Sequence, residues 1–163
     1  MKIAWYALVV LVFSVSASAG DKSLRGLFEK QMTEGGYVGY EIIHVQENET
    51  DGWVLYTAWD KDYPDNRNRP NGGYFQKNGK RWQSAMGTAC NRNSVSMFGL
   101  MGNGYLYCSV LRPDMDFESI TAGDNEAQIF TFNESFTVWV AISPKGNATV
   151  VGTTADGREV NLN

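Results

Sequence analysis

The chain has 163 residues, of which 43% are apolar, 20% charged and 13% aromatic, and its formal net charge is −4. This is the composition of a globular domain, and it excludes collagen-like, coiled-coil and disordered chains. The length predicts one domain with a sizeable core. Because no cluster of lysine and arginine offsets the acidic balance, we expect neither nucleic acid nor an anionic membrane surface as a partner.

Residues 1–19 have the pattern of a secretory signal peptide. Lys2 precedes an apolar run from Ile3 to Val15, and the small residues Ala17-Ser18-Ala19 follow, which is the order that a signal peptidase requires. An uncleaved anchor is the alternative, but the apolar run is shorter than the roughly 20 residues that cross a bilayer. We therefore expect residues 20–163 to form one secreted or periplasmic domain that does not insert into a membrane.

Cys90 and Cys108 are the only two cysteines. In an exported domain, two cysteines with none left over predict one disulfide bond. The loop that it closes is expected to stabilise the fold by about 3 kcal/mol. A redox-active pair would more often have C-x-x-C spacing, so we expect a structural role.

The first predicted elements are a helix and a hairpin. Ser23 is a suitable N-cap, and apolar residues recur at helical spacing until Gly35-Gly36, namely Leu24, Leu27, Phe28 and Met32. The runs 37–46 and 53–59 are rich in β-branched and aromatic residues and predict two paired strands. Both faces of these strands are partly apolar, so we expect the helix to cover one face of the sheet.

Residues 60–73 predict an exposed loop, because they include two prolines and two glycines but no aliphatic residue. Asn78-Gly79 predicts a tight hairpin between the runs 74–76 and 81–83. A strand is expected at 105–111, and the acidic stretch 112–126 is an unassigned connector.

The C-terminal third predicts an antiparallel meander. Apolar residues alternate through 136–143, a turn follows at 144–147, and return strands are expected at 148–154 and 158–162. The predicted fold class is therefore mainly β (α+β): an antiparallel sheet or sandwich with one N-terminal helix and one disulfide.

Aromatic and amide side chains form the predicted ligand-binding site. Trp53 and Trp59 are six residues apart in one strand and share a face, and Tyr56 lies between them in sequence. Asn66 and Asn68 follow in the loop. Flat rings beside amide groups suit a sugar or a peptide. Core packing is the alternative role for the two tryptophans.

The same loop offers oxygen ligands for a cation. Asp60, Asp62 and Asp65 are closely spaced, and calcium binds such carboxylates with 6 to 8 oxygens. The order departs from an EF-hand loop, since no glycine stands at the sixth position. A solvated turn is the alternative, and no other cofactor is expected.

Few residues suit catalysis. His44 is the single histidine and lies in a predicted strand, with no nucleophile motif in the chain. Glu41 is the one acid inside a predicted strand run, where burial would raise its pKa as glycoside hydrolysis requires. Its partner carboxylate is not identified.

One segment resembles a known family. Gly87 to Asn93, followed by Asn103 to Ser109, is similar to the disulfide-closed segment G-x-x-C-x-x-N…G-x-L-x-C of shufflon-type tip adhesins of type IV pili. The resemblance covers only the surroundings of Cys90 and Cys108. It implies an extracellular adhesive or pilus-associated module.

The sequence thus predicts an exported, non-catalytic binding module that recognises a protein or a glycan. A periplasmic inhibitor or immunity protein and a secreted carboxylate-dependent hydrolase are the alternatives. Three sequons begin at Asn48, Asn133 and Asn147, and they matter only in a eukaryotic host.

Overall fold

The computed structural model describes residues 23–92, 94–100, 104–111, 115–132 and 136–163. The predicted signal peptide and Asn133 lie outside these described residues. No helix of the described ranges is long and apolar enough to span a bilayer.

The described residues form one α-helix, one short 3-10 helix and twelve strands. In chain order these are α1 (Leu24–Glu34), β1 (Gly39–Glu47), β2 (Asp51–Trp59), η1 (Pro64–Asn68), β3 (Asn71–Asn78), β4 (Arg81–Ala89), β5 (Ser96–Gly99), β6 (Tyr105–Leu111), β7 (Ser119–Ala122), β8 (Asn125–Glu126), β9 (Gln128–Phe132), β10 (Phe136–Ser143), β11 (Val150–Thr153) and β12 (Glu159–Asn161).

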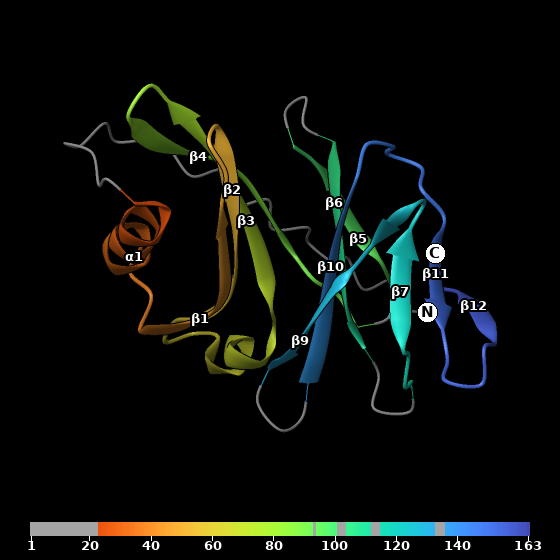
Figure 1. The fold of residues 1–163 in the computed structure, drawn as a ribbon. Coiled ribbons are helices and arrows are strands. Elements are labelled where there is room, and N and C mark those ends of the chain that lie inside the picture. Colours follow the sequence, from red (N-terminus) through yellow and green to blue (C-terminus); the bar gives the residue numbers. More distant parts are fainter. Residues whose placement is uncertain (1–22, 93, 101–103, 112–114, 133–135) are drawn as a thin grey trace, which may run out of the picture.

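The strands form three antiparallel sheets. Sheet A has the order β1-β2-β3-β4, sheet B the order β5-β6-β10-β9, and sheet C the order β12-β11-β7-β8. Figure 1 shows α1, sheet A, sheet B and sheet C as four successive layers. A separate apolar cluster fills each of the three interfaces between layers. The predicted fold class, mainly β and antiparallel with one helix, is confirmed.

Helix α1 begins and ends as its sequence predicts. The Ser23 hydroxyl accepts a hydrogen bond from the Gly26 N–H at 3.1 Å, and the Gly35 N–H donates to the Gln31 carbonyl at the other end. The buried stripe of Leu24, Phe28 and Met32 packs on sheet A. The helix therefore covers one face of that sheet, as expected.

Strand β2 is buried on both faces because it lies inside a layered stack. Trp53 and Leu55 point into the cluster between sheets A and B, whereas Val54 and Tyr56 point into the cluster beneath α1. This alternation follows from the two-residue period of a strand. A strand covered on both sides explains why the run 53–59 is apolar at nearly every position.

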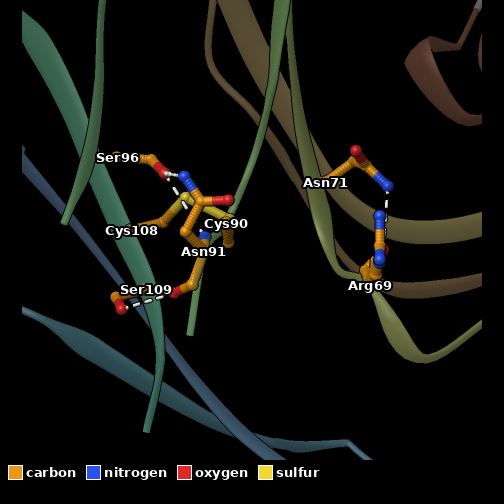
Figure 2. The surroundings of a disulfide bond; sticks show 7 residues. All are labelled: Arg69, Asn71, Cys90, Asn91, Ser96, Cys108 and Ser109. Carbon is orange, nitrogen blue, oxygen red and sulfur yellow. Dashed lines mark hydrogen bonds between the residues drawn. A yellow bond between two sulfur atoms is a disulfide. The ribbon is translucent and has the colours of Figure 1, made fainter. Parts of the chain in front are cut away.

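The predicted disulfide between Cys90 and Cys108 is present and joins two sheets. Cys90 follows β4 of sheet A, Cys108 lies in β6 of sheet B, and their Cα atoms are 5.3 Å apart. Figure 2 shows that Asn91 fixes the adjoining turn: its backbone and amide nitrogens donate to the Ser96 hydroxyl, and its carbonyl accepts from the Ser109 hydroxyl. The bridge therefore links the two halves of the main sandwich.

The predicted C-terminal meander is wrong at its first turn, whereas its second pairing, between β11 and β12, is present. Strand β10 pairs with β6 and β9 in sheet B, whereas β11 pairs with β7 and β12 in sheet C. The connection at 144–149 thus changes sheets. The alternation of apolar residues in β10 predicts one buried face, but both faces of this strand are buried. Val138 and Val140 pack against sheet A, and Trp139 packs against sheet C.

Two further boundaries differ from the prediction. The supposed connector 112–126 contains β7 and β8, and the supposed loop 60–73 ends where β3 begins at Asn71. Gly72 and Gly73 are buried in β3 because large side chains, from Phe98 and Phe75 respectively, fill the space beside them. These two glycines therefore make room for neighbouring aromatic rings inside a strand and do not form a turn.

Candidate functional site

The structure removes two residues from the predicted ligand-binding set. Trp53 and Tyr56 are 2% and 6% exposed and belong to different core clusters, on opposite faces of β2. Although Trp53 and Trp59 occupy one face of the strand, six residues separate them by about 20 Å along it. A buried ring has no surface left for a partner, so the packing alternative describes Trp53 and Tyr56.

Trp59 lies at the end of β2, where sheet A meets solvent. Its indole ring is half-buried, and Gly39 of the paired strand β1 lies against it. The guanidinium of Arg67, in η1, stands 4.8 Å from the ring centre. Two separate elements therefore hold this ring in one orientation, with a cation–π contact on it.

Backbone hydrogen bonds fix two residues with exposed apolar side chains near the end of β2. The Val38 N–H donates to the Trp59 carbonyl at 2.9 Å, and Val38 is 59% exposed. The Asp60 carboxylate accepts from the N–H groups of Asp62 and Tyr63, both at 2.8 Å. This turn presents Tyr63, which is 64% exposed and directly precedes η1. We call the surface of Val38, Trp59, Tyr63 and Arg67 the Trp59 corner.

Two tyrosine phenols near the Trp59 corner have raised pKa values. Burial, with a contribution from the Asp60 carboxylate, raises the pKa of the Tyr37 phenol. Burial also raises the pKa of Tyr56 well above its usual range, and Tyr37 adds to that effect. Both phenols therefore stay protonated at neutral pH.

The other predicted loop residues lie in or near η1. Asn66 is half-buried and Asn68 is exposed, and both border the corner through η1, which contacts β2. Asp62 and Asp65 are exposed, while one oxygen of Asp60 is occupied by two backbone donors. Within the described ranges no three His, Cys, Asp or Glu side chains gather as a cation site would need. The calcium hypothesis gains no support from this turn.

His44 and Glu41 both lie in β1. The His44 ring lies 5.0 Å from that of Trp53 and 4.7 Å from that of Phe130, and burial lowers the pKa of its imidazole. Glu41 is exposed rather than buried, and the residue opposite it on β2 is Thr57. The burial on which the acid-catalyst hypothesis depended is therefore absent.

A small cleft lies between sheets B and C, with a volume of about 230 Å³. Trp139 and Met115 contribute apolar lining, and Arg92, Ser94 and Asn161 contribute polar lining. The Arg92 guanidinium stands over the Phe136 ring at 4.0 Å. This volume is below the 300–1,000 Å³ typical of ligand pockets, so the Trp59 corner is the stronger candidate site.

The Trp59 corner includes the predicted residue Trp59, with the predicted Asn66 and Asn68 in η1 beside it, and three residues that the sequence did not single out: Val38, Tyr63 and Arg67. Tyr63 carried a usable signal, because it is a large aromatic residue inside an otherwise polar loop. Arg67 follows Trp59 by eight positions, a separation that only the fold of η1 turns into contact. Val38 carried no signal, since it is one of several apolar residues in the predicted strand run 37–46.

Comparison with known proteins gives no relative. No protein-family model matches the chain, and neither a curated protein nor a solved structure is significantly similar to it. The resemblance of the disulfide segment to pilus tip adhesins thus stays a prediction.

Proposed function

We propose that this protein is an exported, non-catalytic binding module that contacts a protein partner through the Trp59 corner. The observation that carries the proposal is the gathering of Val38 and Tyr63, the two most exposed large hydrophobic side chains of the described residues, beside one Trp–Arg pair. Isolated exposed hydrophobic residues are normal, and two of them held by the backbone near one aromatic ring favour an interaction surface.

The composition of the corner favours protein over glycan. Tyr, Trp and Arg are the residues that contribute most binding energy at protein interfaces. Both Gly39 and Arg67 contact the Trp59 ring, which limits its use as a stacking platform for a sugar. Arg67 forms no salt bridge within the described part of the chain, so its guanidinium is available to a carboxylate or carbonyl of a partner.

The disulfide supports export, because such bonds persist in oxidising compartments. An inhibitor of a partner enzyme would be one form of this binding module. It would be recognised by loss of the captured enzyme's activity. The hydrolase alternative is not carried forward, because Glu41 is exposed and lies opposite Thr57.

The test compares three versions of the oxidised chain as bait for surface and secreted proteins of the producing cell. Wild type and Met97→Ala, which alters an exposed side chain on sheet B, are expected to retain the same protein. Tyr63→Ala is expected to retain it at least about tenfold more weakly, as loss of an interface anchor does. Equal retention by all three chains contradicts the proposal. Retention that is lost when the captured material is deglycosylated identifies a glycan ligand and overturns the choice of a protein.

A further inference from the structure

Strand β9 is an open edge of sheet B. It pairs with β10 from Gln128 to Phe132, and no described strand pairs with its other side. In Figure 1 it crosses the front of the molecule. Gln128 and Thr131 are exposed, and Ile129 is 40% exposed. The outer side of β9 thus presents unpaired backbone N–H and C=O groups with little covering them.

The neighbouring edge strand β1 has protections that β9 lacks. A bulge interrupts β1 between Ile42 and His44, and Glu41 and Glu47 add charge. Bulges and charged residues are the usual means by which proteins prevent edge-to-edge pairing. The sequence of β9, Gln-Ile-Phe-Thr-Phe, contains neither charge nor proline, and its register with β10 is unbroken.

The other sheet edges of the described residues are also less open. Strands β4, β8 and β12 carry Arg81, Glu126 and Glu159, respectively. Strand β5 is uncharged, but it has only four residues and contacts β4. The protection is therefore missing at one edge alone, that of β9.

We infer that β9 pairs antiparallel with β9 of a second copy about a two-fold axis, so that two B sheets become continuous. Charge favours this occupant: self-pairing of β9 opposes no like charges in any antiparallel register, whereas β1, β4, β8 and β12 each carry a charged residue that stands opposite a like charge in some registers. In the register centred on Phe130, Ile129 lies opposite the second copy's Thr131, a pairing of β-branched residues suited to strands. Such a contact is isologous and closed, so it yields a dimer rather than a fibre.

The inner side of this edge is incompletely covered in the single chain. Phe130 and Ile43 are only partly buried although they pack against the cluster between sheets A and B. The Phe130 ring also contacts the half-buried His44. A second copy beside β9 places its own Phe130 next to this gap, which removes more apolar surface from water.

Sedimentation equilibrium of the oxidised chain over a dilution series tests the inference. Wild type is expected to form a dimer that dissociates on dilution. Thr131→Lys, a change at an exposed edge position, is expected to raise the dimer dissociation constant at least about tenfold, because lysine is a typical edge-blocking residue. Thr149→Lys makes the same change in the exposed loop before β11 and is expected to dimerise like wild type.

Hydrogen exchange of wild type gives an independent readout that requires no variant. Amides of Ile129, Phe130 or Thr131 that point away from β10 are expected to become protected as the protein concentration rises. A wild type that is monomeric throughout, or a Thr131→Lys chain that dimerises like wild type, overturns the inference. Neither result affects the proposed function, because Val38 and Tyr63 lie outside β9.

Discussion

The guanidinium of Arg67 lies 4.8 Å from the centre of the Trp59 indole ring, which ties η1 to the end of β2. Gly39 of β1 contacts the same ring. Two other segments of the chain therefore contact this one side chain of β2, and backbone hydrogen bonds fix Val38 and Tyr63 nearby. A binding surface supported in this way is more rigid than a free loop, which lowers the entropy that binding costs.

Gly39→Ala tests whether Trp59 organises the corner. A Cβ at position 39 would stand 2.7 Å from Cε2 of the Trp59 ring, so the ring or the strand must move. We expect the free energy of unfolding to fall by about 1–3 kcal/mol and partner binding to weaken. Gly99→Ala is the control, because its Cβ would come no closer than 3.8 Å to Tyr105. Equal stability of the two variants in urea would show that the contact is unimportant.

Removal of the disulfide tests the link between sheets A and B. The bond closes a loop with a sequence separation of 18, for which the loop-entropy estimate is about 3 kcal/mol. We expect the double variant Cys90→Ala, Cys108→Ala to lose about that much stability in urea unfolding, with its far-ultraviolet circular dichroism retained. An unchanged midpoint would mean that the sandwich does not depend on the bridge.

Tyr107→Phe tests the turn that carries the chain from sheet B to sheet C. The Tyr107 hydroxyl donates to the Lys145 carbonyl at 2.6 Å and accepts from the Ala148 N–H at 3.1 Å. Without it the buried Ala148 N–H loses its acceptor, so we expect a loss of about 1–3 kcal/mol in stability. Tyr63→Phe removes an exposed hydroxyl and should change stability by less than about 0.5 kcal/mol. Similar losses in both variants would contradict this assignment.

His44 predicts a pH dependence of stability. Burial lowers the pKa of its imidazole in the folded chain below the ordinary value of 6.5. Just below pH 6.5 the unfolded chain therefore binds more protons than the folded chain, and stability falls as the pH is lowered through this window. His44→Phe, which keeps a ring beside Trp53 and Phe130, should abolish the fall, since the chain has one histidine. If the free energy of unfolding varies with pH in the same way for wild type and variant between about pH 5 and pH 7, His44 is not the source of the dependence.

Local signals in the sequence predicted many of the elements correctly. Ser23 and Gly35 bound α1, a hairpin joins β3 to β4 as predicted, with its turn at Gly79-Lys80, and β6 and β10 have the predicted limits of 105–111 and 136–143. Each of these boundaries depends on a helix cap, a tight turn or the two-residue alternation of a strand, and residues close in sequence determine all three. The pairing of Cys90 with Cys108 followed because the chain offers no other cysteine.

The pairing of strands far apart in the sequence could not be predicted from local patterns. Whether β11 pairs with β10 or with β7 depends on contacts between residues about thirty positions apart, such as Val150 opposite Ala122, and no local pattern encodes that choice. The same limit applies to the site. Trp53 and Trp59 are alike in sequence, and only the stacking of sheet B on sheet A buries the first and leaves the second at the edge.

Photo-crosslinking from position 63 tests the central claim most directly. With Tyr63 replaced by p-benzoylphenylalanine, illumination in the presence of cell-surface and secreted proteins is expected to join the chain to one protein partner. The same replacement at Met97, an exposed residue of sheet B, is expected to give no such adduct. An adduct that forms equally well from both positions, or from neither, would contradict the assignment of the Trp59 corner as the binding surface.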